Sequence, residues 1–415
     1  MSESAPNQRT ASLSRKPAGE ARATGSPLEI LRIFLRLGCT SFGGPIAHLG
    51  YFRAEFVERR RWLTEQAYAD LVALSQFLPG PASSQTGFGV GLMRGGLLGA
   101  LAAWTGFTLP SAVLLMLFAY GAGSIADSTI GAGLLHGLKL VAVAIVAQAV
   151  MGMAKSLCPD RERASIATVA LIVMLLVPGS IAQIGTIVAG GVAGFLLCRG
   201  EADMAADSFA MPVSRRLGLF CLVLLFVLLA IAFVPARPGA LALFDAFYRS
   251  GALVFGGGHV VLPLLRNAVV APGWVSDSTF LAGYGAAQAV PGPLFTFAAY
   301  LGAVANVSPG GIAGAAIALV AIFVPGILCV LGTLPFWHAL RARPAAQAAM
   351  RGTNAAVVGL LAAALYSPVF TSAVQSPADV AIAAAGFVLL TVWRAPPLIV
   401  VVLSALAGMG LSLLG

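Results

Sequence analysis

A short run of polar side chains inside an apolar stretch is the feature of this sequence best suited to holding an anion. Ser83, Ser84 and Gln85 directly follow a Pro-Gly-Pro triplet at 79–81. Such a triplet breaks a helix, so the arm that follows it exposes unpaired backbone N–H groups at the positive end of its dipole. A helix N-terminus of this kind, helped by hydroxyl and amide donors, can bind an oxyanion without a buried cation. The sequence therefore predicts an oxyanion site at this break.

The Pro-Gly-Pro break belongs to a pattern that occurs twice along the chain. Residues 34–49 (FLRLGCTSFGGPIAHL) align with 247–262 (FYRSGALVFGGGHVVL), and 75–83 (SQFLPGPAS) align with 287–295 (AQAVPGPLF). Because the same landmarks return in the same order, the sequence predicts an internal duplication with two breaks in each half. A duplicated membrane protein with matching Gly/Pro interruptions is typical of secondary transporters. A duplicated scaffold without a transport role is the alternative.

The candidate substrate-binding residues are the four breaks and the polar side chains beside them. Their glycines permit close approach of a ligand to the backbone, although Gly and Pro can also serve only to kink helices for packing. The flank of the second Pro-Gly-Pro break is less polar, since Leu294-Phe295-Thr296 stands there. The candidates in the first half are Phe42, Gly43, Gly44, Pro45, Gln76, Pro79, Gly80, Pro81, Ser83, Ser84 and Gln85. The candidates in the second half are Phe255, Gly256, Gly257, His259, Gln288, Pro291, Gly292, Pro293 and Thr296.

Three cations in apolar surroundings are further candidates. Arg36 and Arg249 are matched by the duplication, and the planar fork of an arginine suits a tetrahedral oxyanion. Lys139 begins an apolar run. The alternative for all three is an interfacial anchor whose charged end reaches the membrane surface. His259 could carry a proton near neutral pH. The alternative role for its imidazole is a structural hydrogen bond.

The composition excludes a soluble protein. Of the 415 residues, 59% are hydrophobic and 10% are charged, whereas a soluble domain has about 25% charged residues. The net charge of +9 comes from basic residues in short clusters between apolar stretches, which indicates membrane topology rather than nucleic-acid binding. The five cysteines form no paired motif, so we expect no metal site and no cofactor. The sequence contains no set of residues typical of a catalytic site, so we do not expect an enzyme.

The sequence therefore predicts an all-α polytopic membrane protein built from two repeats. We expect a disordered cytoplasmic tail at 1–27, a first repeat at 28–198, a polar linker with one spanning helix at 199–240, and a second repeat at 241–415. This single additional span gives the second repeat the opposite orientation in the membrane. Because basic residues mark the cytoplasmic side of the membrane, a segment with basic residues at both ends must enter the membrane and return to the side from which it started. Each repeat should therefore contain two helical hairpins whose tips lie at the breaks. Hairpins are expected at 28–58, 62–93, 242–270 and 275–305, and full spans near 96–121, 133–154, 164–178, 181–198, 310–334, 351–366, 378–393 and 396–414.

The motifs FGGPIAHLGYF and SQFLPGPASSQTGFGVG, with the degenerate second copies FGGGHVVLP and AQAVPGP, resemble those of the chromate ion transporter family in its long-chain bidomain form. The resemblance covers residues 28–415. It implies a protein of the bacterial inner membrane that exports chromate, a tetrahedral dianion, and so gives chromate resistance. The second half departs from the motif, because Gly258 stands where the first half has Pro45.

The sequence leaves the substrate and the coupling ion open. Sulfate or another oxyanion is the alternative substrate, since sulfate shares the shape and charge of chromate. Without an ATPase motif we expect transport to be driven by a gradient, with the proton as a candidate coupling ion. The expected partners are the oxyanion and the lipid bilayer. Whether the protein forms a homodimer is left open by the sequence. A membrane enzyme or a non-transporting protein is the remaining alternative.

The first prediction concerns topology. The N-terminus, Arg59–Arg61 and Arg341–Arg343 should be cytoplasmic and the C-terminus periplasmic, because basic residues mark cytoplasmic loops. Single cysteines placed in the two basic segments of a cysteine-free chain should react with a membrane-impermeant maleimide only after the cells are opened. Residues 267–275 align with the first basic cluster and should react in intact cells. Protection of 267–275 in intact cells would show that the repeats are not inverted.

Overall fold

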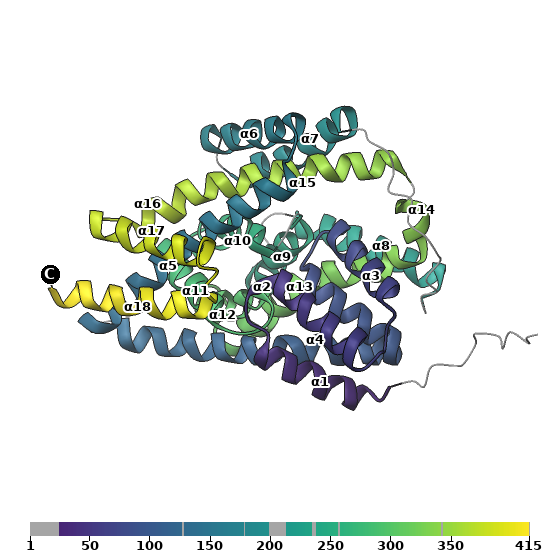
Figure 1. The fold of residues 1–415 in the computed structure, drawn as a ribbon, viewed down its shortest axis with the longest axis horizontal. Coiled ribbons are helices and arrows are strands. Elements are labelled where there is room, and N and C mark those ends of the chain that lie inside the picture. The colour runs from purple at the N-terminus through teal and green to yellow at the C-terminus, as the bar shows by residue number, and fades with distance from the viewer. Residues whose placement is uncertain are drawn as a thin grey trace, which may run out of the picture.

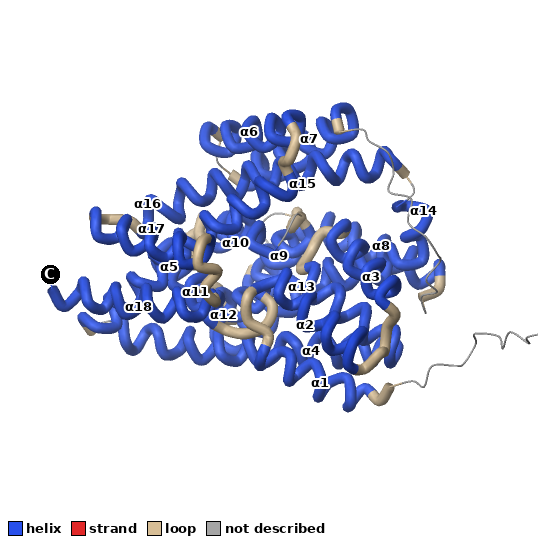
Figure 2. The backbone as a smooth tube through the Cα atoms, in the orientation of Figure 1, coloured by secondary structure: helices blue, strands red, loops and turns tan. Residues whose placement is uncertain are grey.

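The computed structural model of this chain describes residues 25–126, 128–177, 179–198, 213–234, 238–255, 258–341 and 343–414. Within these ranges the regular secondary structure is helical throughout, without a strand (Figures 1 and 2). Nearly all of the predicted tail and the polar part of the linker lie outside the described residues, as do Gly256 and Gly257. The repeat boundaries themselves stay predictions.

The first half has short helices separated by the predicted breaks, followed by long helices. The chain leaves helical geometry at 41–43 and again at 78–81. One long element holds both the arm after the second break and the next span, with non-helical backbone at Gly95 and Gly96 between them. The elements are α1 (Pro27–Thr40), α2 (Gly44–Arg53), η1 (Ala54–Arg59), α3 (Glu65–Phe77), α4 (Ala82–Ala126), α5 (Thr129–Leu157), α6 (Arg161–Leu176) and α7 (Ser180–Leu197).

The second half repeats this order after one additional helix, α8 (Arg215–Ala232). Its chain leaves helical geometry around 253–255 and again at 290–293. The broken pairs are α9 (Gly239–Ala252), η2 (Gly258–Val260), α10 (Val261–Val269), α11 (Asp277–Ala289), η3 (Leu294–Thr296) and α12 (Phe297–Val304). The remaining elements are α13 (Gly311–Thr333), η4 (Leu334–Phe336), α14 (Trp337–Arg341), α15 (Pro344–Ala364), η5 (Leu365–Phe370), α16 (Thr371–Ala373), α17 (Pro377–Thr391) and α18 (Pro397–Leu414).

Several helices have the length and apolar composition of membrane spans. Five segments of at least 18 residues qualify, and they lie in α4, α5, α8, the α13–η4 segment and the segment that begins with α15. Shorter apolar helices, among them α17 and α18, accompany them. The chain is therefore an all-α polytopic membrane protein, as predicted.

The first two broken helix pairs return to the end of the molecule from which they started. Gly25 donates its N–H to the carbonyl of Arg94 at 2.9 Å. Arg60 lies 3.7 Å from Glu29, and the guanidinium groups of Arg60 and Arg94 lie over the ring of Trp62. The start of α1, the end of η1 and the end of the α4 arm therefore meet, which confirms the two predicted hairpins.

The second half closes its hairpins with equivalent contacts. Asn306 donates its N–H to the carbonyl of Trp274, the match of Trp62, at 2.8 Å. A β-carbon at Gly239 would lie 3.0 Å from the carbonyl oxygen of Ser308. The beginning of α9, the loop before α11 and the loop after α12 therefore lie together, as the corresponding segments do in the first half.

The two halves exchange their long helices. Helix α5 of the first half packs against α17 and α18 of the second, and α15 of the second half packs against α6 and α7 of the first (Figure 1). Glycines matched by the duplication lie at both crossings. Gly137 of α5 lies against the backbone at Ser404, and Gly352 of α15 lies against Gly190 and Gly194. Each half therefore buries one of its long helices against helices of the other half.

The second prediction tests this exchange. A β-carbon at Gly194 would lie 2.5 Å from the carbonyl oxygen of Ala348, whereas a β-carbon on the same helix at Gly185 would meet open space. Gly194→Leu should therefore lower the melting temperature of the detergent-solubilised protein by several degrees, because overpacking costs about 1–3 kcal/mol. Gly185→Leu carries the same change in helix propensity and should leave the melting temperature near that of the wild type. Equal melting temperatures for the two variants would contradict the crossing.

Candidate functional site

The breaks of the two halves are joined by reciprocal backbone hydrogen bonds. Gly80 donates its N–H to the carbonyl of Val254 at 2.7 Å, and Gly292 donates its N–H to the carbonyl of Ser41 at 2.9 Å. Val254 and Ser41 are matched by the duplication, and each directly precedes a Phe-Gly-Gly motif. The Pro-Gly-Pro tip of each half thus binds the Phe-Gly-Gly tip of the other half. We call this arrangement the tip junction.

The central glycines of the Pro-Gly-Pro tips have backbone geometry that other residues avoid. Gly80 has φ +121° and Gly292 has φ +97°, a region in which a β-carbon is strained. Each also contacts a helix of the opposite half. A β-carbon at Gly80 would lie 3.2 Å from Cα of Gly326 in α13, and one at Gly292 would lie 2.8 Å from Oγ of Ser111 in α4. Gly326 and Ser111 follow the matched prolines Pro325 and Pro110, so both contacts obey the duplication.

The two Phe-Gly-Gly tips also meet each other. Gly43 and Gly44 have φ +100° and +78°, and they lead into α2 through Pro45. A β-carbon at Gly258 would lie 3.3 Å from Cγ of Pro45. The second half lacks the proline of the motif at this position, and the close approach of Pro45 gives a physical reason for glycine there.

A buried histidine joins the two breaks of the first half. His48 of α2 is 1% exposed. Its Nε2 lies 3.2 Å from the carbonyl oxygen of Ser41, and its Nδ1 lies 3.3 Å from Oγ of Ser83. His48 was not among the residues predicted from the sequence, although an ionisable side chain in an apolar segment is a candidate functional residue. The imidazole holds the end of α1 and the start of the α4 arm in one polar cluster.

Several buried hydroxyl groups of the first half have no hydrogen-bond partner within the described part of the chain. Ser84 and Thr86 lie in the first turns of the α4 arm, and they are 5% and 0% exposed. Their hydroxyl oxygens are unpaired, as are those of Ser41 and Thr108. Buried polar groups normally find a partner. The α4 arm therefore begins with unused donors in a site closed to solvent.

Gln85 connects this arm to the second half. Its Nε2 donates to the carbonyl of Pro79 at 2.8 Å and lies 3.2 Å from the carbonyl of Gly326. Its Oε1 is buried without a partner in the described structure. The amide of Gln85 therefore holds the first Pro-Gly-Pro tip in place, which leaves the hydroxyls to face a ligand.

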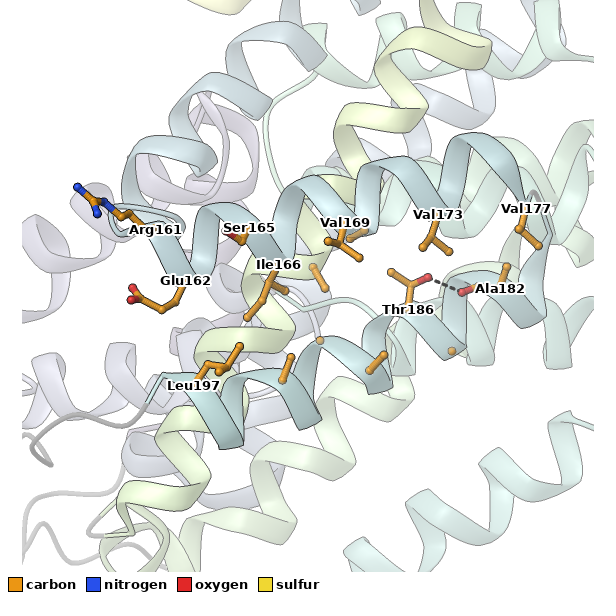
Figure 3. Close-up of a pocket in the computed structure, with 16 residues that line it drawn as sticks. Arg161, Glu162, Ser165, Ile166, Val169, Val173, Val177, Ala182, Thr186 and Leu197 are labelled. Carbon is orange, nitrogen blue, oxygen red and sulfur yellow. Dashed lines mark hydrogen bonds between the residues drawn. The ribbon is translucent and has the colours of Figure 1, made fainter.

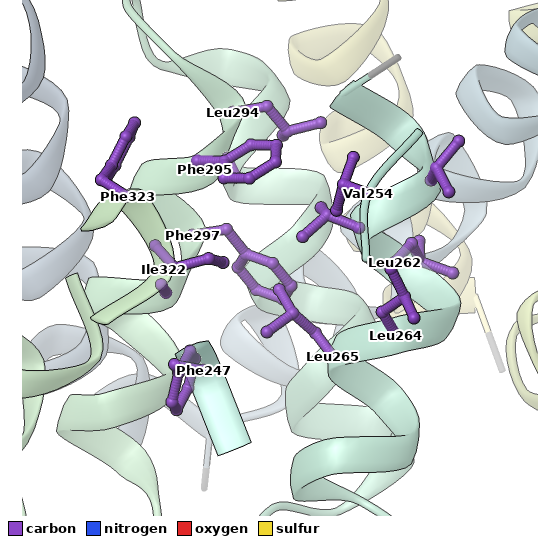
Figure 4. Close-up of a cluster of buried hydrophobic side chains, with 14 of the residues drawn as sticks. Phe247, Val254, Leu262, Leu264, Leu265, Leu294, Phe295, Phe297, Ile322 and Phe323 are labelled. Atoms are coloured by element: carbon purple, nitrogen blue, oxygen red, sulfur yellow. The ribbon is translucent and has the colours of Figure 1, made fainter. Parts of the chain in front are cut away.

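The matching arm of the second half is packed with aromatic side chains. Phe295 stands where Ser83 stands in the first half, and its ring lies 5.8 Å from that of Phe323 (Figure 4). Phe297 stands where Gln85 stands and packs on Phe280. The Thr296 hydroxyl donates to the carbonyl of Pro293 at 2.7 Å. The second break is therefore closed by apolar packing, with its one hydroxyl already satisfied.

The other second-half candidates form a separate polar pair. His259 Nδ1 lies 2.8 Å from the Tyr284 hydroxyl. The Gln288 side-chain nitrogen is buried without a partner among the described residues. Phe255 is half-buried at the tip. These residues lie at the second-half breaks, but their role in binding stays a prediction.

The three cations and one glutamine do not supply the hydrogen bonds of the tip junction in the described structure. Arg36 and Gln76 are exposed. The guanidinium group of Arg249 lies over the ring of Phe233, and Lys139 Nζ lies 3.1 Å from Oγ of Ser278. The hydrogen bonds at the junction come instead from backbone groups, His48 and Gln85.

The matched helix breaks predict that the four tips meet near the membrane midplane between the repeats and line one water-accessible cavity. The tips do meet, but the described structure has no solvent-exposed polar side chains at the first Pro-Gly-Pro arm. Ser83, Ser84 and Gln85 are 2%, 5% and 3% exposed. The reciprocal hydrogen bonds bring the tips into direct contact, which excludes solvent from these side chains. The conformation described is therefore closed at the breaks.

A separate groove of about 780 Å³ lies between α6 and α7 (Figure 3). Its lining is mostly aliphatic, with Val169, Val173 and Leu197 among the contributing side chains, and Arg161 and Glu162 lie together at one end. The Thr186 hydroxyl donates to the carbonyl of Ala182 on its own helix at 2.7 Å. An apolar groove of this kind offers few donors to a dianion, so the tip junction is the better candidate.

Comparison with known proteins identifies the family. The family model described as chromate transporter matches the chain twice, over residues 28–195 and 241–409. The chain belongs to the chromate transporter family. The two matches fall on the two halves defined by the duplicated breaks, as expected for the long bidomain form.

Similar proteins come from distant bacteria. The chain is 28% identical to the chromate transport protein of Pseudomonas aeruginosa over 90% of this chain and 89% of that protein. It is 27% identical to a probable chromate transport protein of Synechococcus elongatus over 92% and 94% of the two chains. It is 26% identical to the chromate transport protein of Cupriavidus metallidurans over 84% of each. No solved structure matches the chain significantly.

The third prediction tests the tip junction. Gly80→Leu should abolish transport while the protein still inserts into the membrane, because the new side chain would collide with Gln85 and Gly326. Gly179→Leu is the matched control, since Gly179 has a similar φ of +129° but open space around it. Substrate flux and the amount of folded protein in the membrane should be measured for both. Similar loss of flux in both variants would mean that backbone strain alone, and not the junction, limits transport.

Proposed function

We propose that this protein exports chromate across the bacterial inner membrane, with the anion held at the start of the α4 arm. The observation that carries the proposal is the group of buried, unpartnered hydroxyls at a broken-helix N-terminus. Backbone N–H groups and the helix dipole favour an anion there. The names of the Pseudomonas and Cupriavidus relatives support chromate as the substrate.

The membrane potential is sufficient to drive export. Moving one elementary charge across 100 mV is worth about 2.3 kcal/mol, so a dianion leaving a negative cytoplasm gains about 4.6 kcal/mol per 100 mV. Export of chromate in this way lowers its cytoplasmic concentration and gives resistance. The protein acts as a transporter rather than as an enzyme, because the substrate leaves chemically unchanged.

We place the N-terminus in the cytoplasm and the C-terminus in the periplasm. The basic residues Arg59–Arg61 support the cytoplasmic side of the first repeat, and the apolar helix α8 between the halves supports inversion of the second repeat. Inverted repeats commonly alternate access by moving one half against the other around a fixed site. The paired hydrogen bonds from Gly80 and Gly292 are suited to this movement, because each can open while its counterpart stays closed.

Sulfate or another tetrahedral oxyanion is the second candidate substrate. The donors at the α4 arm are hydroxyl and backbone groups, which recognise charge and tetrahedral shape rather than the central atom. Chromate and sulfate therefore have to be compared directly in the same assay.

The fourth prediction tests the site. Ser83→Ala combined with Ser84→Ala should weaken chromate binding at least about tenfold, because each hydrogen bond to a charged group contributes about 1.5–3 kcal/mol. Chromate and sulfate flux should be measured in proteoliposomes with an imposed potassium diffusion potential. Wild-type flux should rise with the potential in the direction that moves negative charge toward the positive side.

The matched control is Ser156→Ala combined with Thr168→Ala. Both hydroxyls are exposed and donate to carbonyls of their own helices. This control should keep wild-type affinity. Unchanged chromate affinity in the Ser83/Ser84 variant would remove these hydroxyls from the site, and flux that is indifferent to the potential would contradict gradient-driven export.

A further inference from the structure

The hydrogen bonds of His48 define the proton positions on its ring. The carbonyl oxygen of Ser41 can only accept, so Nε2 at 3.2 Å carries the hydrogen and donates it. In a neutral imidazole the other nitrogen then has no hydrogen. Nδ1 must therefore accept, and the group 3.3 Å away that can donate to it is the hydroxyl of Ser83.

This arrangement engages the hydroxyl hydrogen that an anion needs. While His48 is neutral, the hydrogen of Ser83 points to Nδ1 and the oxygen of Ser83 offers only lone pairs to the rest of the site. An oxyanion would meet these lone pairs and be repelled. If Nδ1 takes a proton, it donates to Ser83 Oγ instead, and the Ser83 hydrogen is released toward the site.

We propose that binding of the oxyanion is linked to protonation of His48, so that each dianion crosses the membrane together with one proton. The inference rests on the proposed function, because it uses the same anion site. The added proton comes from water when the tip junction opens, resides on Nδ1 while the anion is bound, and returns to water when the anion leaves on the other side. No covalent bond to the anion forms.

The surroundings of His48 make the anion the natural partner of the added charge. The groups that face it are the Ser41 carbonyl from the end of α1, the Ser83 hydroxyl from the α4 arm, and the ring edge of Phe107 from later in α4. None of these three neighbours is charged. A buried imidazolium without a partner is unfavourable, so the charge is stable when the dianion occupies the site.

The linkage is confined to the first half. Val261 aligns with His48 and Phe295 aligns with Ser83, so the second half has neither group at these positions. Its own histidine, His259, is paired with the Tyr284 hydroxyl instead of with the Pro-Gly-Pro arm. One proton therefore accompanies one anion, and the net charge moved is −1 instead of −2. Export still follows the membrane potential, but it becomes sensitive to the pH on the two sides.

The fifth prediction is that the purified protein takes up about one proton for each anion bound near neutral pH. Calorimetric titration with chromate, and separately with sulfate, in buffers of different ionisation enthalpy measures this number directly. The dissociation constant of the wild type should rise about tenfold for each pH unit above neutrality. Sulfate is included because chromate itself takes up a proton near neutral pH, whereas sulfate does not.

Two variants separate this linkage from the site itself. His48→Gln imitates the neutral ring, since its amide can donate to Ser41 and accept from Ser83, so it should bind the anion more weakly and without proton uptake. Ser83→Ala keeps the imidazole but has no hydroxyl to release, and it should also lose the proton uptake. Melting temperatures near that of the wild type show that both variants are folded.

Four results would overturn the inference. Proton uptake that persists in folded Ser83→Ala would show that the hydroxyl does not connect anion and proton, even if His48→Gln failed to fold. A pH slope that persists in His48→Gln would belong to another group or to the ligand. Anion binding by the wild type without proton uptake would leave the proposed function intact and refute the linkage, whereas absence of anion binding and flux in the wild type would refute both.

Discussion

The architecture depends on how the backbone groups freed by four broken helices are satisfied in an apolar environment. An unpaired N–H or carbonyl cannot face lipid, because each costs several kcal/mol. This chain satisfies two of these donors by pairing Gly80 of the first half with Val254 of the second, and Gly292 with Ser41. The glycines, the hairpins that carry them and the close contacts with α4 and α13 all follow from that pairing. A donor that is held only by a carbonyl is also one that an anion can compete for.

The two halves keep the same scaffold and divide its chemistry unequally. Both tips have positive-φ glycines and reciprocal hydrogen bonds. The first break has buried hydroxyls without a partner among the described residues and an imidazole that contacts Ser83. At the second break the Thr296 hydroxyl and His259 are already paired, and Phe295 and Phe297 fill the space. In the proposed mechanism, the apolar second tip is the surface against which the polar first tip opens and closes. The duplication then supplies two equivalent junctions, and the anion is held at the first of them.

The sequence predicts the fold better than the site, for physical reasons. Gly and Pro act on the backbone where they stand, so the breaks at 79–81 and 291–293 and the helices between them could be located directly. The site depends on contacts between halves, which local patterns do not encode. Arg36 and Gln76 were selected because the duplication repeats them, but both are exposed. His48 was not selected, although it stands four residues after Gly44, and its counterpart in the second half is Val261. Its contacts with Ser41 and Ser83 become visible only in the folded chain.

The exchange of α5 and α15 between the halves also has a consequence for synthesis of the chain. The small-residue face of α7, with Gly190 and Gly194, is buried only by α15. The ribosome completes α7 long before α15, and during that interval the first half lies in the bilayer with this face uncovered. A chain that stopped after the linker would expose the same face permanently. Helix α15, which is made only after α8 to α14, thus completes the packing of the first half.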